Sequence, residues 1–174
     1  MQSWKIPPPI KVFEAIGAIG DARVHAVDDG ATRSVWEVIS SDGSKTYRVE
    51  VSADGREISS NDNASYWQGY LGYPAIAVLI ARGTLAANPE AIRLLTGIPW
   101  KELNRRYRND YQRTTADVVR IVQERGGDFD AVRAETAAMN DSLATLGLQR
   151  GPRSRPPTPA PETVNRSAAD RRDG

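Results

Sequence analysis

The chain has 174 residues, of which 40% are hydrophobic and 26% are charged, and its formal net charge is +1. This length suits one compact domain with a tail, and the absence of cysteine excludes disulfides, thiol nucleophiles and thiolate metal sites. The single histidine, His25, excludes any site that needs two imidazoles.

Hydropathy and charge indicate where the protein works. No segment has the roughly 20 consecutive apolar residues of a membrane-spanning helix, and the N-terminus lacks the apolar stretch of a signal peptide. We therefore expect a cytoplasmic protein with no membrane partner. Residues 150–174 contain six arginines and three acidic residues. Residues 1–149 are close to neutral. This argues against a domain that binds nucleic acid over most of its surface, but it allows a local basic patch.

The first 20 residues predict a helix. Three prolines at positions 7–9 suit a first helical turn and precede residues 10–19. The apolar residues of this segment recur at helical spacing and form one face: Val12, Phe13, Ile16 and Ile19. Gly20 and Asp21 end the helix.

Residues 22–60 predict an antiparallel β-meander. The segments 32–40 and 46–52 alternate apolar and polar residues, as half-buried strands do, and the shorter segments 22–27 and 56–60 flank them. Asp-Gly pairs lie in the three connections, at positions 29–30, 42–43 and 54–55. Glycine supplies the positive φ that such turns require.

After residue 63 the periodicity is helical. We predict helices over residues 74–82, 88–95, 100–113, 115–125 and 129–146, separated by glycine, proline and capping residues. The fold class is therefore α+β: an N-terminal helix, an antiparallel β-meander of three to four strands, and a bundle of about five helices. We assign residues 1–147 to a single domain, with the helix and meander in 1–63 and the helical part in 64–147.

Residues 148–174 predict a disordered tail rich in proline and arginine. Five of the 11 prolines lie between positions 152 and 161, and the segment has too few apolar residues to offset the entropy of ordering. Residues 156–159 have the composition of a proline-rich ligand for a protein partner. The same composition also suits a purely solubilising tail.

The segment from the last predicted strand to the next helix resembles the SWIM zinc-finger module. In that module a hairpin leads to Cys-x-Cys, a spacer and Cys-x-His at the start of a helix. Residues 75–79, Ala-Ile-Ala-Val-Leu, match the helix start. The ligand positions fall at Ser59, Asn61, Gly72 and Pro74, which cannot bind zinc as thiolate or imidazole. The resemblance implies a metal-free relative in layout, with packing in place of the ion.

Residues 59–73 are unusually rich in amide and aromatic side chains. They predict a partner-binding surface made of Asn61, Asp62, Asn63, Tyr66, Trp67, Gln68, Tyr70 and Tyr73. A second interpretation is structural, because aromatic residues often supply buried area and Asn-Asp-Asn suits a loop with a helix cap. A calcium site at Asp62 would lack the required number of carboxylates.

Residues 91–111 resemble a helix-turn-helix, with a basic second helix. The side chains predicted to contact nucleic acid are Lys101, Asn104, Arg105, Arg108 and Arg113. The motif departs from the pattern at Arg93, where a small residue is usual, and at Thr96, where an apolar one is usual. A solvated charged face would give the same sequence.

No set of catalytic residues is recognisable. His25 lies in a strand pattern without a nominated partner, and no nucleophile, phosphate-loop or dinucleotide motif occurs. We therefore predict no catalytic residues, no metal and no cofactor. The leading hypothesis is a non-catalytic cytosolic binding or accessory protein that associates with DNA or RNA through the basic, aromatic helix 100–113. The alternative is a protein-interaction subunit of a larger assembly, which would use the aromatic surface of residues 59–73 or the proline-rich tail.

Overall fold

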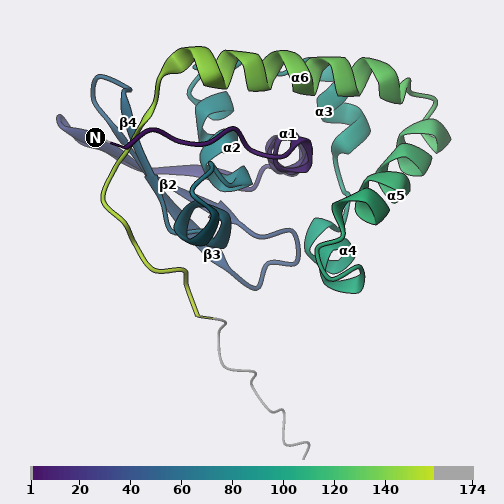
Figure 1. The fold of residues 1–174 in the computed structure, drawn as a ribbon, viewed down its shortest axis with the longest axis horizontal. Coiled ribbons are helices and arrows are strands. Elements are labelled where there is room, and N and C mark those ends of the chain that lie inside the picture. Colours follow the sequence, from purple (N-terminus) through teal and green to yellow (C-terminus); the bar gives the residue numbers. More distant parts are fainter. Residues whose placement is uncertain (1, 159–174) are drawn as a thin grey trace, which may run out of the picture.

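The computed structural model describes residues 2–158 and confirms the α+β fold class (Figure 1). An N-terminal helix precedes a sheet, and five further α-helices of the described residues follow. The elements are α1 (Pro9–Gly20), β1 (Val24–Asp29), β2 (Arg33–Ile39), β3 (Thr46–Ser52), β4 (Glu57–Ser60), η1 (Ala64–Gln68), α2 (Tyr73–Ala81), α3 (Pro89–Leu95), α4 (Trp100–Arg106), α5 (Tyr111–Glu124), α6 (Phe129–Leu146) and β5 (Gln149–Arg150).

The sheet is the predicted meander with one strand added. Strands β1 to β4 pair antiparallel in sequence order. Gly43 and Gly55 have φ values of +73° and +71°, as the tight turns require. One face of the sheet carries the buried residues Val38, Val49, Val51 and Ile58 and packs against α2. His25 lies on the edge strand β1 and is exposed.

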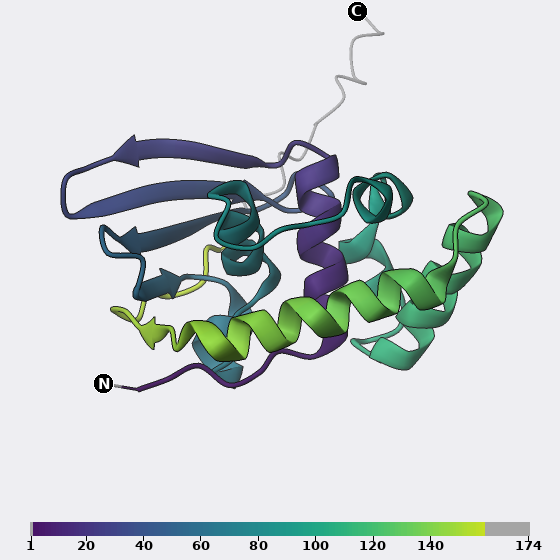
Figure 2. The same cartoon turned by 90° about the horizontal axis from the view of Figure 1, so that it is seen from above.

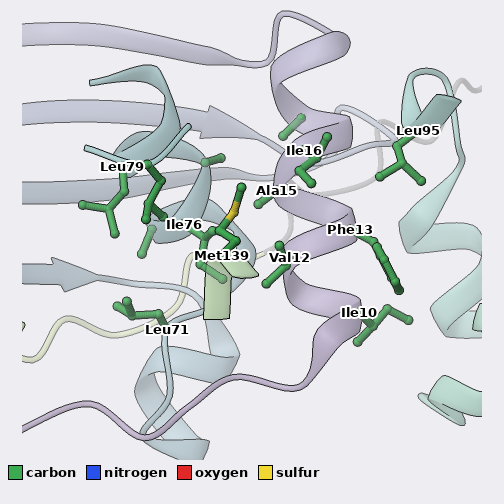
Figure 3. Close-up of a cluster of buried hydrophobic side chains, with 14 of the residues drawn as sticks. Ile10, Val12, Phe13, Ala15, Ile16, Leu71, Ile76, Leu79, Leu95 and Met139 are labelled. Carbon is green, nitrogen blue, oxygen red and sulfur yellow. The ribbon is translucent and has the colours of Figure 1, made fainter. Parts of the chain in front are cut away.

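Helix α1 lies at the centre of the molecule. Figure 2 shows the sheet on one side of α1, α4 and α5 on the other, and α6 running along the domain past both. Every residue from Val12 to Ala18 is buried, and α1 packs on α2, α3 and α6. Ile16 of α1 and Ile76 and Leu79 of α2 are at most 1% exposed and meet in the core (Figure 3). The nearly all-apolar sequence of α2 explains this central position.

The predicted helix over residues 100–113 is wrong, because the chain turns within it. Helix α4 ends at Arg106, and Arg108 and Asn109 have positive φ values of 51° and 60°. Asp110 then caps α5, since its Oδ1 accepts hydrogen bonds from the backbone of Gln112 (3.2 Å) and Arg113 (3.3 Å). Aspartate is a strong N-cap residue. Helix α5 therefore begins at Tyr111 rather than at 115.

The tail begins later than predicted. Leu148 is only 5% exposed, and Gln149–Arg150 form β5, which pairs parallel to β4. Backbone hydrogen bonds from Gln149 to Arg56 (2.8 Å) and from Gly151 to Ile58 (2.9 Å) fix this strand. The free edge of β4 satisfies the backbone of residues 149–151, so these residues need few apolar side chains to be ordered. The predicted disorder of residues 159–174 lies outside the described residues.

We expect the substitution Ile76→Ala to lower the free energy of unfolding by about 2–5 kcal/mol, because it leaves a cavity in the α1–α2 core. Urea denaturation followed by circular dichroism measures the change. The matched control is Ile6→Ala, since Ile6 is 64% exposed and its truncation should change stability by less than about 0.5 kcal/mol. Equal losses for the two variants would contradict this description of the core.

Candidate functional site

A cleft of about 600 Å³ lies between α1, the loop that joins β2 to β3, residues 62–73 and the start of α4; we call it the central cleft. Its size is that of a small-molecule or single-nucleotide site. Six residues of the predicted partner-binding surface line it: Asp62, Asn63, Trp67, Gln68, Tyr70 and Tyr73. Lys101 and Asn104 of the predicted nucleic-acid site line it as well.

A buried ion pair forms one wall of the central cleft. Lys11 and Glu14 are one helical turn apart on α1, and the Lys11 Nζ–Glu14 Oε2 distance is 3.2 Å. Asn104 Nδ2 donates a second hydrogen bond to Glu14 (2.5 Å). Burial alone would lower the pKa of Lys11, but the adjacent Glu14 carboxylate outweighs it and the pKa is raised. Lys11 is therefore a permanent cation, and its Nζ lies 5.1 Å from the ring centroid of Tyr111.

Tyrosines dominate the other walls. Tyr47 and Tyr73 meet edge to face with ring centroids 6.0 Å apart, and the Arg23 guanidinium lies 5.8 Å from the Tyr73 ring. Burial, reinforced by the negative charges of Asp62 and Glu14, raises the pKa of Tyr47 to about 12. Burial also raises the pKa of Tyr70 to about 12 and that of Tyr73 further. All three hydroxyls thus stay protonated near neutral pH and can donate hydrogen bonds.

Asp62 has a structural role at the cleft, because protein donors already occupy its carboxylate. Ser60 Oγ (2.6 Å), Ser65 Oγ (2.6 Å) and Ser65 N (3.0 Å) all donate to it. Ser65 Oγ accepts from the backbone N of Gly72 (3.1 Å), which is the N-cap of α2. A hydrogen-bonded network therefore joins the end of β4 to the start of α2, the two segments that a SWIM module ties with zinc. Residues 2–158 contain no cluster of three or more metal-ligating side chains.

A second cleft, of about 430 Å³, adjoins the first and is lined by residues from both ends of the described chain. Its cations are Lys5, Arg150 and Arg153. Arg150 lies 4.7 Å from the ring of Trp4, and Arg153 lies 4.1 Å from the ring of Tyr66. Such cation–π pairs hold the guanidinium groups close to the aromatic rings.

Trp67 stands between the two clefts. It lines both, as does Gln68, and it is 67% exposed, the largest value among the big apolar side chains of residues 2–158. Trp67 belongs to η1, a single turn of π-helix closed by the hydrogen bond from Gly69 N to Ala64 O (3.2 Å). π-Helical turns are rare and occur frequently at functional sites. The turn places this indole outward at the boundary of the clefts.

The other predicted site residues are dispersed. Asn61 accepts a hydrogen bond from the backbone of Arg48 (2.7 Å) and thereby extends the sheet, whereas Tyr66 lines the second cleft. Arg105 and Arg108 are exposed and line neither cleft.

The predicted basic face is divided among three elements. Lys101 of α4 pairs with Asp42 (3.3 Å), and Arg113 of α5 pairs with Asp110 (3.7 Å). Arg108 lies in the turn between these helices. The five predicted nucleic-acid contacts therefore do not form one cationic helix face.

Sequence reasoning missed eleven residues of the central cleft, and those with charged or tyrosine side chains are Lys11, Glu14, Arg23, Lys45, Tyr47 and Tyr111. Lys11 and Glu14 did carry a signal, since they are the only charged residues of α1 and are spaced by one helical turn. The others gave none, because only the fold brings β3 and the start of α5 to the same cleft.

Residues 4–149 match the family model described as Uncharacterised conserved protein UCP014422. The chain belongs to this family. The matched range includes the whole central cleft and Trp67 but stops before Arg150 and Arg153. Searches of curated proteins and of solved structures gave no match. Within residues 2–158 no helix is both long and apolar enough to cross a membrane.

We expect stability to fall between about pH 10 and pH 12 through the buried tyrosines. The unfolded state ionises Tyr47 near its ordinary pKa of 10, whereas the folded state does so only near 12, so alkali favours unfolding across this interval. Urea unfolding at several pH values should show a smaller fall for Tyr47→Phe than for the unmodified protein. An identical pH dependence in both would contradict the burial of this hydroxyl in the cleft.

The substitution Gly72→Ala should destabilise the protein strongly, because a Cβ at this position would collide with the Asp62 carboxylate. We expect a loss of about 3 kcal/mol or more in the free energy of unfolding, since the collision breaks a buried hydrogen-bond network. Thermal and urea unfolding measure the loss. Gly43→Ala is the control, as its Cβ would meet open space and costs only the roughly 1–2 kcal/mol of a left-handed backbone.

Proposed function

We propose that the protein is a non-catalytic nucleic-acid-binding protein that holds single-stranded RNA or DNA across the two adjoining clefts. The observation that carries the proposal is the exposed Trp67 between two clefts lined by cations and aromatic rings. Proteins that bind single strands combine a positively charged groove with aromatic side chains on which bases stack. An exposed indole at a cleft boundary is suited to such stacking.

The charge balance of the clefts supports the proposal. Lysines and arginines number four in the central cleft and three in the second, seven in all, against two carboxylates. Glu14 is already bonded to Lys11 and Asn104, and Asp62 to serine donors. The charge of Glu14 is offset by Lys11, and Asp62 keeps its charge but is only 5% exposed. Arg23 and Lys101 in turn pair with Asp21 and Asp42. The two linings together have a formal charge of +5, whereas the rest of the chain has one of −4.

The path replaces the helix as the proposed contact surface. A strand that stacks a base on Trp67 would run along Lys5 and Arg153 on one side and toward Lys45 and Lys101 on the other. Lysine and arginine would contact phosphates, and the rings of the clefts would contact bases. These contacts are independent of sequence, so we expect weak base preference.

A protein-interaction subunit is the second candidate, and the same tryptophan favours it. Tyr66 and Trp67 meet edge to face with ring centroids 4.6 Å apart, and exposed aromatic pairs are common centres of protein interfaces. Salt dependence separates the two candidates. Phosphate contacts weaken steeply as salt displaces counterions, whereas an aromatic protein interface responds little.

We expect Trp67→Ala to weaken binding of an oligonucleotide by about 5- to 100-fold, the loss of one stacked base. Fluorescence anisotropy with labelled single-stranded RNA and DNA, titrated at several salt concentrations, measures the affinity and its salt slope. Lys5→Glu with Arg153→Glu should reduce both. The control is Arg133→Glu, because Arg133 is an exposed arginine of α6 that lines neither cleft.

The double variant Arg105→Glu with Arg108→Glu tests the helix face directly. If it abolishes binding while Trp67→Ala leaves it unchanged, the clefts are not the contact surface. Binding of the unmodified protein that shows no salt slope would overturn the nucleic-acid assignment and favour a protein partner.

A further inference from the structure

We infer that the central cleft binds a phosphate monoester, the dianionic group of a free nucleotide or of a strand end. The inference goes beyond strand binding, since it concerns the wall chemistry of one cleft and stands without the second cleft. It starts from an imbalance between hydrogen-bond donors and acceptors in that wall.

Both carboxylates of the wall already have protein donors. The Glu14 carboxylate accepts from Lys11 and Asn104, and the Asp62 carboxylate accepts from Ser60 and Ser65. A ligand that offers donors would have to compete with these bonds. The wall therefore favours an anionic ligand over a cationic one.

Donors, by contrast, are in surplus. Lys11 Nζ has three N–H groups and one acceptor among residues 2–158, the Glu14 carboxylate. Arg23 Nη2 and Trp100 Nε1 also lack an acceptor in the described part of the chain, but protein atoms cover both, so they give a ligand no contact in this conformation. The Lys11 ammonium lines the cleft, and a ligand rich in acceptor oxygens gains from meeting its remaining N–H groups.

The tyrosines add neutral donors to these cations. Tyr47, Tyr70 and Tyr73 line the cleft, and their raised pKa values keep the hydroxyls protonated at physiological pH. Tyr47 lines the cleft and is only 8% exposed. Phenol hydroxyls and ammonium groups together suit an anion with several oxygens.

A terminal phosphate fits better than a carboxylate or an internal phosphodiester. It has three acceptor oxygens and a charge of about −1.5 to −2 near neutral pH, whereas the other two groups carry a single negative charge. Lys11, Arg23, Lys45 and Lys101 line the same space. Three of them pair with Glu14, Asp21 and Asp42, so a phosphate would be met by Lys45 and by the N–H groups that these pairs leave over. A volume of about 600 Å³ also accommodates the attached nucleoside.

The test compares ligands that differ only in the terminal phosphate. Isothermal titration calorimetry is run with adenosine and adenosine monophosphate, and with an oligothymidylate of about eight nucleotides carrying a 5′-hydroxyl or a 5′-phosphate. We expect the phosphate to raise affinity by about tenfold or more in at least one pair, the effect of charge-assisted hydrogen bonds. A gain in the mononucleotide pair alone identifies a free nucleotide, and a gain in the oligonucleotide pair identifies a strand end.

Two variants assign the effect to the cleft. Tyr47→Phe removes one hydroxyl without changing the ring, and Lys11→Met removes the cation; each should reduce the phosphate-dependent gain by several-fold. Tyr107→Phe is the matched control, because its hydroxyl bonds Asp117 outside both clefts. Circular dichroism checks folding, and Tyr47→Phe remains decisive if Lys11→Met unfolds.

Equal affinity for phosphorylated and unphosphorylated ligands in both pairs overturns the inference. An undiminished gain in Tyr47→Phe and a folded Lys11→Met overturns it as well. The proposed function, binding of a single strand, is tested independently of the phosphate site by the same titrations. Binding of adenosine monophosphate without any oligonucleotide binding removes strand binding and keeps the phosphate site, whereas phosphate-independent oligonucleotide binding does the reverse.

Discussion

The buried carboxylate of Asp62 holds together the segment on which both clefts depend. Its hydrogen bonds to Ser60 and Ser65 tie the end of β4 to η1, and Ser65 in turn fixes Gly72 at the start of α2. The π-helical turn between these anchors carries Trp67 outward. A buried carboxylate is tolerated here because every donor it needs lies within a few residues. Where a zinc-binding module would use an ion, this chain uses serine hydroxyls.

The Lys11–Glu14 pair on α1 is a second buried polar contact beside the central cleft. Desolvating two charges inside an otherwise apolar helix is costly, and such a pair is weak evidence of stability. The pair persists beside a cleft, where Asn104 satisfies the second carboxylate oxygen. Under the proposed function, these charges serve ligand contact rather than folding. The core itself relies on the apolar residues of α1 and α2 (Figure 3).

Local patterns specified the fold better than the site. Alternation and Asp-Gly turns located the meander, and the apolar run of α2 indicated its central place. The sequence did not reveal that α4 ends at Arg106, because residues 100–113 keep helical spacing. The turn is visible only in the structure, where Arg108 and Asn109 have left-handed backbone conformations and Asp110 caps α5. Residues 59–73 predicted a binding surface, and six of its residues line the central cleft. Its partners on α1, β3 and α5 come from distant parts of the chain, and no local spacing connects them.

Strand β5 has a consequence for the order in which the molecule is completed. Arg150 donates its backbone N–H to Gln2 (2.8 Å), so the second cleft joins residues near the start of the chain to residues about 150 positions later. A domain folds as a unit, and the core that supports the central cleft includes Met139 and Leu148. The lining of the central cleft ends at Tyr111 and that of the second cleft at Arg153. We therefore expect neither cleft to form on a nascent chain before α6 and β5 have been made.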